Sequence, residues 1–335
     1  MRKIRIAQIG INRYSHAPDV FHTLRAYPEN FDLVGYALVE DERETCADKL
    51  GCFDGYPELT LEEILNDPTI EAVTVETDEI HLTKYALMAV EAGKHVHMEK
   101  PGSQNLADFE RLIDAVKKSG KVFHIGYMYR YNPLIAKAIE RARAGELGSI
   151  YSVEAHMSRL DNKATREWFG TFKGGMMFYL GCHLVDLVLQ IQGMPSEVHP
   201  FNTATGIDGV NTEDLGFAVL KYPNGVSVIR MGGTEVSATR RRQLVICGSN
   251  GTIEIRPLEL RVSEEEYMQY TKETDRILNE SGKSVTTEIE SEVFQRYEKM
   301  MSSFAAMVRG EIQNPYTCDY ELQLFKVILK CCGIN

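Results

Sequence analysis

Short apolar runs alternate with amphipathic stretches through the first third of the chain, and this alternation limits the possible folds severely. The apolar runs lie at residues 4–9, 31–39, 72–76, 95–98 and 122–125, and the helical patterns at 17–27, 41–50, 60–66, 80–92 and 104–118. Strands that alternate with helices form βαβ units, in which the strands lie parallel. Residues 1–122 are therefore predicted to form a doubly wound parallel sheet, an α/β domain.

The second part of the chain has a different pattern, in which strands follow one another directly. Strand-like runs lie at residues 150–159, 197–205, 214–222, 226–234, 242–247 and 252–257, and helical patterns at 134–144, 175–192, 291–309 and 319–332. Pro223-Asn224-Gly225 and Ser249-Asn250-Gly251 are hairpin sequences. Residues 123–335 are therefore predicted to form an α+β domain, with helices on one face of an open antiparallel sheet. The polar segment 264–292 is predicted to be a long excursion or mobile loop, and packing of the last helix back on the first domain is left open.

Size, charge and cysteine usage narrow the class of protein. A chain of 335 residues is long enough for two domains. The net charge of −11 argues against nucleic acid or an anionic membrane as the main partner. The seven cysteines include no Cys-x-x-Cys pair, and no segment resembles a signal peptide or a membrane span. These features predict a cytoplasmic protein. The histidines show no ligand spacing, and no metal site is predicted.

The turn after the first strand is a candidate nucleotide loop. Gly10 is followed by Asn12, Arg13 and Ser15, at a place where a dinucleotide fold uses glycines beneath a helix amino terminus. Asn tolerates left-handed backbone, and Ser can cap a helix and donate to phosphate. Glu40, at the end of the second strand, is the expected acceptor for ribose hydroxyls. Its carboxylate disfavours a 2′-phosphate, and Arg43 is the one cation nearby in the sequence, so NAD is favoured over NADP.

A lysine follows the fourth strand-like run. The sequence Gly93-Lys94-His95-Val96-His97-Met98-Glu99-Lys100-Pro101 predicts a helix stop, a short buried strand and a proline that ends the strand. Lys100 then lies at the carboxyl end of that strand, where open α/β sheets bind ligands. A lysine whose pKa is lowered by its surroundings can exchange protons near neutral pH.

Several blocks of sequence together resemble one family. They are Ala89 to Val96, Glu99-Lys100-Pro101, Gly126 to Pro133, Gly145-Glu146-Leu147-Gly148, Gly174-Gly175 and Gly181-Cys182-His183-Leu184-Val185-Asp186. The chain resembles the glucose-fructose oxidoreductase, inositol dehydrogenase and rhizopine catabolism (Gfo/Idh/MocA) family over nearly its whole length. The resemblance implies an amino-terminal Rossmann domain, a carboxy-terminal domain with an open antiparallel sheet, and assembly into a homodimer or homotetramer. It also implies that Lys100 handles a proton, that His183 is the second catalytic residue, and that Thr77 and Glu99 lie near the cofactor.

The chain departs from the family pattern at three places. Asn12 and Ser15 replace glycines, and Asp78-Glu79 replaces the usual Pro-Asn after Thr77. Tyr179 stands where the family has an aspartate four residues before the histidine.

The second helix of interest, taken as residues 176–192, is predicted to carry Tyr179, His183 and Asp186 on one stripe. Gly181 is expected to let this helix approach a nicotinamide. Tyr179 can hydrogen-bond the substrate or join a proton relay, since a phenol both donates and accepts. Packing remains the alternative interpretation for Tyr179, and a structural role is the alternative for Asp186.

Further substrate-binding candidates lie at the domain junction and before the Gly174-Gly175 turn. Tyr127 and Tyr129 can stack on a sugar ring, and Arg130 can hold a hydroxyl or carboxylate. Arg159 and Trp168, the only tryptophan, are expected to wall the substrate pocket.

The function predicted is an NAD-dependent oxidoreductase that takes a hydride from a hydroxyl-bearing carbon of a sugar, polyol or glycoside, with Lys100 and His183 flanking that oxygen from opposite domains. Two alternatives stay open. One is a redox-neutral lyase or glycosidase of the same family, in which the hydride returns to the substrate. The other is a nucleotide-binding regulatory protein whose catalysis has decayed.

Overall fold

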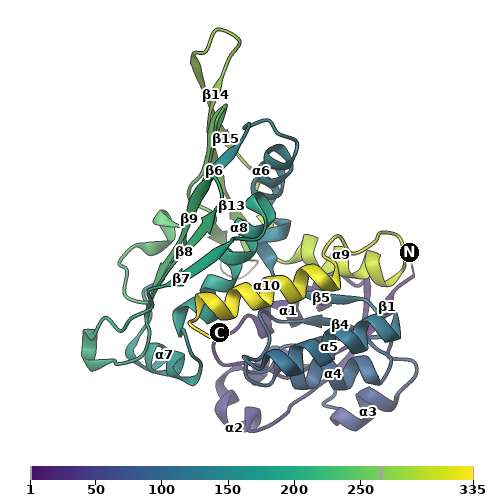
Figure 1. Cartoon of the computed structure of the whole chain (residues 1–335). Helices are drawn as coiled ribbons and strands as arrows, with labels where there is room; N and C mark the ends of the chain where they lie inside the picture. The colour runs from purple at the N-terminus through teal and green to yellow at the C-terminus, as the bar shows by residue number, and fades with distance from the viewer. Residues whose placement is uncertain (1, 264–266, 335) are drawn as a thin grey trace. The chain divides into compact units, whose positions relative to one another are not determined.

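The chain folds into two compact units, drawn in Figure 1 from a computed structural model that describes residues 2–263 and 267–334. The first unit runs to Tyr127 and includes Tyr297–Gln323, and the second contains Met128–Arg296 and the residues from Leu324 onward. This division differs from the expected boundary at residue 122, because the strand at 123–125 pairs with the first sheet. Among the described residues, no helix is both long and apolar enough to cross a membrane. The cytoplasmic location stays a prediction.

The first unit is built on a parallel sheet, as the alternating pattern predicts. Its elements are β1 (Ile4–Ile9), α1 (Ala17–Ala26), β2 (Phe31–Ala37), α2 (Glu42–Thr45), a 3₁₀ helix (Ala47–Phe53), α3 (Leu61–Asn66), β3 (Ala72–Val75), α4 (Leu82–Glu91), β4 (His95–Met98), α5 (Leu106–Ser119), β5 (Phe123–Ile125) and α9 (Glu298–Val308). The strand order is β2-β1-β3-β4-β5. Because β2 and β3 lie on opposite sides of β1, the order reverses at the β1–β3 pair, and open sheets bind ligands at the carboxyl ends of such strands.

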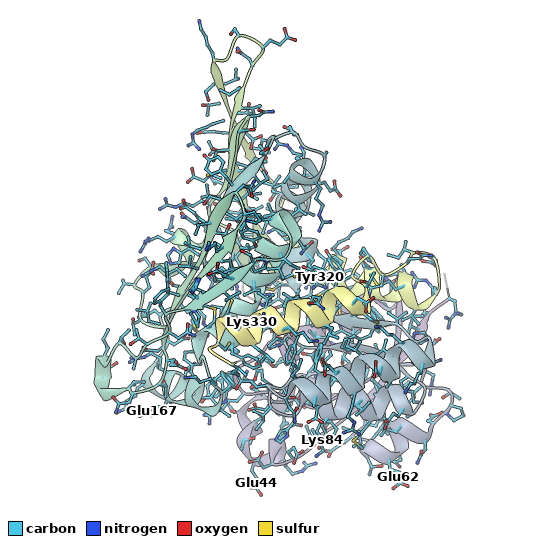
Figure 2. The ribbon with its side chains drawn as sticks, in the orientation of Figure 1. Glu44, Glu62, Lys84, Glu167, Tyr320 and Lys330 are labelled. Atoms are coloured by element: carbon cyan, nitrogen blue, oxygen red, sulfur yellow. The ribbon has the colours of Figure 1, made fainter. Side chains whose placement is uncertain are left out.

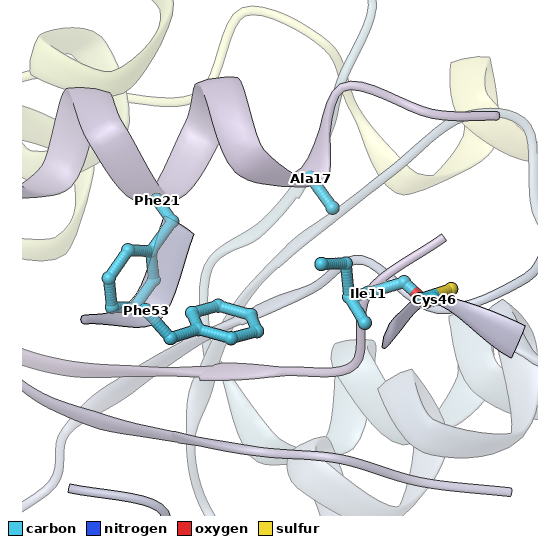
Figure 3. Close-up of a cluster of buried hydrophobic side chains, with 5 residues drawn as sticks. All are labelled: Ile11, Ala17, Phe21, Cys46 and Phe53. Carbon is cyan, nitrogen blue, oxygen red and sulfur yellow. The ribbon is translucent and has the colours of Figure 1, made fainter. Parts of the chain in front are cut away.

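An aromatic cluster fixes the segment that joins β1 to α1. Phe21 of α1 lies edge-on to Phe53, with ring centroids 4.7 Å apart, and Tyr36 of β2 stacks on Phe53 at 3.9 Å. Ile11 and Ala17 belong to the same buried cluster (Figure 3). Both ends of the β1–α1 turn are therefore anchored in the core, which holds the residues between them in a defined position.

The second unit contains an eight-stranded sheet of order β15-β14-β11-β10-β6-β9-β8-β7. Its main elements are α6 (Pro133–Arg143), β6 (Ile150–His156), α7 (Lys163–Trp168), α8 (Cys182–Gln192), β7 (Glu197–Pro200), β8 (Leu215–Tyr222), β9 (Gly225–Gly232), β10 (Gln243–Gly248), β11 (Gly251–Ile255), β14 (Lys272–Leu278) and β15 (Ser284–Glu290). The short strands β12 (Leu260–Ser263), β13 (Met268–Tyr270) and β16 (Phe294–Gln295) form a second, small sheet. The eight-stranded sheet is antiparallel except at the β6–β9 pair. Both predicted hairpins are confirmed, since β8–β9 and β10–β11 close at the two Asn-Gly turns.

The prediction of a long excursion over residues 264–292 is wrong for the part that the structure describes. Residues 268–290 form β13, β14 and β15, whereas 264–266 lie outside the described residues. Glu273 and Asp275 of β14 face inward and bind Arg141 of α6 at 2.9 and 2.7 Å. Because buried ion pairs and exposed polar side chains replace an apolar alternation here, the hydrophobic pattern carried no strand signal.

Other predicted elements differ in extent. The strand predicted over 197–205 ends at Pro200, and the helix predicted over 41–50 is divided into α2 and a 3₁₀ helix. The helix predicted from residue 291 begins at Glu298 and belongs to the first unit, where it contacts α1. The last helix, α10 (Cys318–Cys331), is divided between the two units at Gln323. Of the helices predicted to cover the second sheet, α6 and α8 contact its strands.

Candidate functional site

The turn after β1 requires the glycine that the sequence places there. Gly10 has φ of +85°, in the left-handed region. A Cβ at this position would lie 2.7 Å from Cβ of Thr77, which follows β3. Thr77 itself is fully buried. Both backbone conformation and close packing at the β1–β3 pair therefore depend on the missing side chain.

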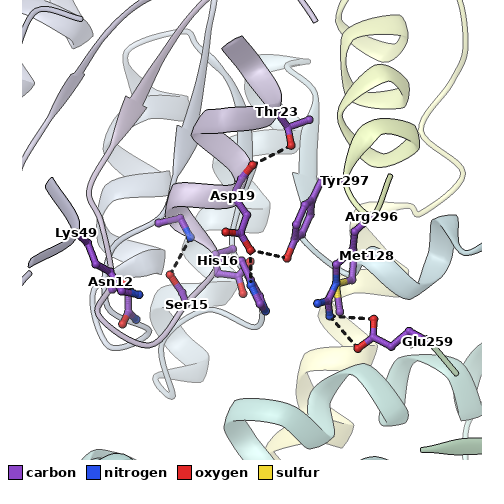
Figure 4. A network of polar contacts seen from close by, with 12 residues as sticks. Asn12, Ser15, His16, Asp19, Thr23, Lys49, Met128, Glu259, Arg296 and Tyr297 are labelled. Atoms are coloured by element: carbon purple, nitrogen blue, oxygen red, sulfur yellow. Dashed lines mark hydrogen bonds and ion pairs between the residues drawn. The ribbon is translucent and has the colours of Figure 1, made fainter. Parts of the chain in front are cut away.

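Asn12 and Ser15 hold the turn through their side chains. The Asn12 Nδ2 donates to Glu79 Oε2 at 2.7 Å, and its Oδ1 accepts from the backbone N–H of Tyr14 at 2.8 Å. The Ser15 Oγ accepts from the N–H of Ala17 at 3.2 Å, at the start of α1 (Figure 4). The N-cap residue of α1 is His16, which makes no side-chain capping hydrogen bond, so Ser15 accepts from the first N–H of the helix without being its N-cap. The left-handed backbone expected at Asn12 is absent, since its φ is not positive.

One cation near this turn comes from elsewhere in the sequence. Arg13 is exposed, whereas Lys49 Nζ lies 3.4 Å from the carbonyl oxygen of Asn12. Burial lowers the pKa of Lys49. Figure 4 shows Lys49 beside Asn12. Sequence reasoning missed Lys49 because it lies on the 3₁₀ helix Ala47–Phe53, and no motif marks it.

Glu40 stands after β2 with φ of +50°. Its carboxylate accepts from Lys84 Nζ and from the Tyr85 hydroxyl, both at 2.7 Å. These hydrogen bonds from Lys84 and Tyr85 lower the pKa of Glu40, so the group is ionised at neutral pH. Arg43 is therefore not the only cation near Glu40, because α4 supplies Lys84 (Figure 2). Arg43 itself pairs with Glu58.

Buried carboxyl groups crowd the carboxyl ends of β1, β3 and β4. Successive backbone hydrogen bonds place Gly10, Glu76 and Glu99 in adjacent register at this edge of the sheet. Glu76, Glu79, Glu42 and Glu99 are each at most 5 % exposed. Burial raises the pKa of Glu79 to about 8 and that of Glu42 to about 7. Glu79 is therefore largely protonated and Glu42 partly so at neutral pH, which reduces their repulsion of a nearby phosphate.

The raised pKa of Glu79 predicts that stability falls as pH rises. The folded protein keeps the Glu79 proton up to about pH 8, whereas the unfolded chain loses it near its ordinary value of 4.5. The stabilisation that this proton provides is complete below pH 4.5 and is lost between pH 4.5 and about pH 8. We expect the free energy of unfolding to fall by roughly 2 kcal/mol between pH 6 and pH 8 from this group. Urea unfolding at both pH values measures it.

The matched variant is Glu79→Gln, which keeps a neutral side chain of the same shape and cannot titrate. We expect the free energy of unfolding of this variant to differ much less between pH 6 and pH 8 than that of the wild-type protein. An unchanged pH dependence in Glu79→Gln would contradict the assignment to Glu79.

Lys100 lies two residues beyond β4 with its side chain only 4 % exposed. Its Nζ is 3.2 Å from Oε1 of Glu99, whose side chain is 6 % exposed. Tyr127, which follows β5, is also buried in this unit. A lysine amine held against one carboxylate, with little access to water, has the surroundings in which an amine can exchange protons with a bound molecule.

In the second unit, Tyr179 lies on a π-helical turn, Met177–Gly181, that precedes α8. The expected single stripe of Tyr179, His183 and Asp186 assumed an unbroken α-helix, and the wider turn interrupts that helix. The Tyr179 hydroxyl accepts from Arg159 Nη1 at 3.3 Å, and its ring lies edge-on to Trp168 with centroids 5.1 Å apart. Arg159 also pairs with Asp161 at 2.9 Å. Tyr179, Arg159 and Trp168 are therefore brought together.

His183 lies in the first turn of α8 and is 3 % exposed. Its ring is edge-on to that of Tyr129, with centroids 5.4 Å apart, and the Tyr129 hydroxyl donates to the sulfur of Met157 at 3.2 Å. Gly181 does not offer open space to a nicotinamide, because a Cβ there would lie 2.8 Å from the terminal methyl of Met231. The side chains of Met177 and Met231 occupy the space beside Gly181 where the sequence predicts a nicotinamide.

Arg130 and Asp186 form a buried bidentate ion pair. Arg130 Nε and Nη2 donate to the two carboxylate oxygens of Asp186 at 3.0 and 2.8 Å. Both side chains are at most 1 % exposed, and Gln190 donates to the same carboxylate at 2.8 Å. The pair ties the segment after β5 to α8. In the same unit, Glu259 accepts from Arg296 (Figure 4), and it also accepts from Arg242.

Comparison with known proteins identifies the class. Residues 4–127 match the oxidoreductase family with an NAD-binding Rossmann fold, and residues 135–254 match the GFO/IDH/MocA C-terminal domain. The chain belongs to the Gfo/Idh/MocA family of oxidoreductases, and the family predicted from the sequence is confirmed.

Named relatives are similar at low identity. The chain is 29 % identical over 245 residues to scyllo-inositol 2-dehydrogenase (NADP(+)) IolW of Bacillus subtilis, covering 72 % of this chain and 66 % of that one. It is 26 % identical over 264 residues to myo-inositol 2-dehydrogenase of Thermotoga maritima, covering 75 % and 74 %. The structure of levoglucosan dehydrogenase in complex with NADH and levoglucosan superposes with a TM-score of 0.78 at 17 % identity, covering 99 % and 98 %.

Proposed function

We propose that this protein is an NAD-dependent oxidoreductase that removes a hydride from a hydroxyl-bearing carbon of a sugar, polyol or glycoside. The observation that carries the proposal is the buried Lys100 amine, paired with Glu99 at the edge of the sheet where Gly10 and Thr77 shape the nucleotide turn. The names of the inositol dehydrogenase and levoglucosan dehydrogenase relatives support the substrate class.

The residues of the first unit fit a dinucleotide. Gly10 allows close approach of the backbone, Ser15 accepts from the first N–H of α1, and the Glu40 carboxylate is ionised and partly exposed. We assign cofactor binding to Gly10, Asn12, Arg13, Ser15, Glu40, Thr77, Glu99 and Lys100. When bound, the nicotinamide would accept the hydride. The residues of the chain would bind the phosphates and orient the ribose.

The proton of the substrate hydroxyl is assigned to Lys100 and His183. As carbonyl character develops on the substrate carbon, the oxygen must lose its proton, and positioned amines and imidazoles take it. Tyr179, with Arg159 donating to its hydroxyl, would hydrogen-bond the substrate oxygen. Arg159, Trp168, Tyr127 and Tyr129 are assigned to substrate binding. Because Arg130 and Asp186 bind each other, we assign them to positioning α8, the helix that carries His183.

The first experiment follows nicotinamide absorbance while sugars, inositols and glycosides are added to the protein with NAD. A rise from reduced nicotinamide supports the dehydrogenase and identifies its substrate class. A flat absorbance trace in a mixture whose substrate has been converted to product would contradict the dehydrogenase and support the redox-neutral reaction. A flat trace with unaltered substrate throughout would leave a nucleotide-binding protein without catalysis. The homodimer or homotetramer implied by the resemblance stays a prediction, which sedimentation of the same sample tests.

The preference for NAD over NADP is tested at Glu40. Replacing Glu40 with Gln removes the negative charge but retains the shape and leaves Lys84 without its counter-ion. We expect Glu40→Gln to weaken NADH binding about tenfold and to strengthen NADPH binding, because a charged acceptor for the ribose hydroxyls is lost and a cation is released for a 2′-phosphate. Fluorescence titration with both nucleotides measures the two dissociation constants. Equal changes for the two nucleotides would exclude Glu40 as the discriminating residue.

A further inference from the structure

Three ionisable side chains lie on one face of the parallel sheet of the first unit. His97 and His124 are paired in register on β4 and β5, and Glu76 directly follows β3, next to β4. Glu76 and His97 are fully buried, and His124 is 1 % exposed. Phe304 of α9 packs against both imidazole rings, with centroids 5.8 and 5.6 Å away. None of these three side chains has a part in the function proposed above.

Their contacts form a chain. Nδ1 of His97 lies 2.7 Å from Nδ1 of His124, so one of these nitrogens donates to the other. Nε2 of His97 lies 3.6 Å from Oε1 of Glu76. Within the described part of the chain, His97 Nε2 and both carboxyl oxygens of Glu76 have no hydrogen-bond partner. Buried polar atoms are rarely left in that state, and here a donor and an acceptor face each other.

The charges that face Glu76 come from three segments. Glu99 and Lys100 follow β4, Asp19 lies on α1, and Glu79 lies in the loop after β3. Burial, and next the negative charge of Glu99, raise the pKa of Glu76 well above its ordinary value. Burial also lowers the pKa of His97 to about 3, which keeps its ring neutral.

These conditions select one arrangement of protons. If His124 donated to His97, then His97 would carry its proton on Nε2 and point it at Glu76, an arrangement that favours an ionised carboxylate beside Glu99. Two neighbouring buried carboxylates repel each other strongly. If His97 donates from Nδ1 to His124 instead, then Nε2 carries a lone pair, and a neutral Glu76 can donate to it. The second arrangement satisfies the facing atoms without burying a charge.

We propose that Glu76 is a neutral carboxylic acid that donates to His97, and that His97 in turn donates to His124. Because Glu76 is neutral, it places no second negative charge near the Lys100 amine, and this allows Lys100 to act as a base. The inference rests on the proposed function in assigning proton exchange to Lys100. Glu76, His97 and His124 are positioning residues, because they act on the substrate through Lys100. A neutral Glu76 adds no negative charge to that of the Glu99 carboxylate, which lies 3.2 Å from the Lys100 amine, and less negative charge nearby holds the proton on the amine less firmly.

The protonation pattern is tested first without substrate or cofactor. Nitrogen NMR of the wild-type protein is expected to show His97 protonated at Nδ1 and unprotonated at Nε2 at pH 7. Infrared spectra are expected to contain a carbonyl band of a protonated carboxylic acid at pH 8 that disappears in Glu76→Gln. A proton on Nε2 of His97, or no band that depends on Glu76, would overturn the proposal.

The effect on Lys100 is tested with a matched pair of variants, Glu76→Gln and Glu99→Gln. Each replaces one carboxyl group by a neutral amide of the same shape, and melting curves check that both fold. The pKa of Lys100 is measured from the pH dependence of its reductive methylation. We expect Glu99→Gln to lower it by about one unit or more and Glu76→Gln to change it by less than about half a unit.

Equal large shifts in both variants would mean that Glu76 carries a negative charge, and the proposal would fail. Neither measurement uses enzymatic turnover. A protein that shows the expected proton pattern and Lys100 shifts but never reduces nicotinamide would therefore contradict the proposed function and leave this inference standing.

Discussion

Replacing Lys100 with Met is expected to lower kcat for nicotinamide reduction by about a thousandfold. The proton of the substrate hydroxyl then has no amine to receive it, and a positioned proton-exchanging group contributes roughly 10²–10⁴-fold to rate. Methionine retains much of the volume of the lysine stem in a place where the side chain is 4 % exposed. Steady-state kinetics at saturating substrate, with the substrate found by the absorbance screen, measures the effect.

Nucleotide binding and a surface lysine provide the controls for Lys100→Met. We expect the dissociation constant for NADH to change by less than about tenfold, because Gly10, Ser15 and Glu40 remain in place. Lys118, which is exposed on α5, is the matched control, and Lys118→Met is expected to leave kcat unchanged. A Lys100→Met protein with wild-type turnover would refute the assigned proton acceptor.

Replacing Arg130 with Met is expected to lower the free energy of unfolding by about 3–5 kcal/mol. The change leaves the Asp186 carboxylate in a place where it is 1 % exposed and without the two hydrogen bonds at 3.0 and 2.8 Å. Removing one partner of a buried ion pair has an effect of this size, because the remaining charge is desolvated and uncompensated. Urea unfolding followed by circular dichroism gives the free energy.

The double variant Arg130→Met/Asp186→Leu separates loss of the pair from an unpaired charge. Since no buried charge remains, we expect it to recover most of the stability lost in Arg130→Met. The exposed pair Arg111–Asp108 on α5 is a matched surface control, where Arg111→Met is expected to cost less than about 1 kcal/mol. A double variant no more stable than Arg130→Met would show that the arginine acts by packing.

The fold was predictable where a local pattern determines it. The alternation before residue 122 predicts the parallel sheet, and the Asn-Gly turns predict two hairpins, all of which the structure contains. The strands β14 and β15 were missed for a physical reason. Their inward side chains include Glu273 and Asp275, whose burial depends on Arg141, more than a hundred residues earlier in the sequence. No local hydrophobic pattern can reveal a strand whose interior contacts are ionic.

The candidate site was predictable from residues that carry a motif and not from residues that only become neighbours in the fold. Gly10, Lys100 and His183 stand in sequence blocks that mark them. Lys49 and Glu76 carry no such mark, and they reach the nucleotide edge only through the strand order and through the 3₁₀ helix. Strand register sets Glu76 beside Glu99, and register between β3 and β4 cannot be read from either strand alone.

Because Tyr179 lies in the π-helical turn Met177–Gly181, its orientation relative to α8 depends on the number of residues in that turn. Such a turn accommodates one residue more than an α-helical turn over the same rise. Deleting a single residue from it would restore ordinary α-helical spacing, and each residue of an α-helix turns the chain by about 100°. Everything before the deletion would then rotate about the helix axis while His183 kept its place on α8. Deleting one residue from this turn would therefore change which side chain lies beside His183. For the same reason, residue spacing counted across the turn does not identify corresponding side chains in a relative whose helix is unbroken.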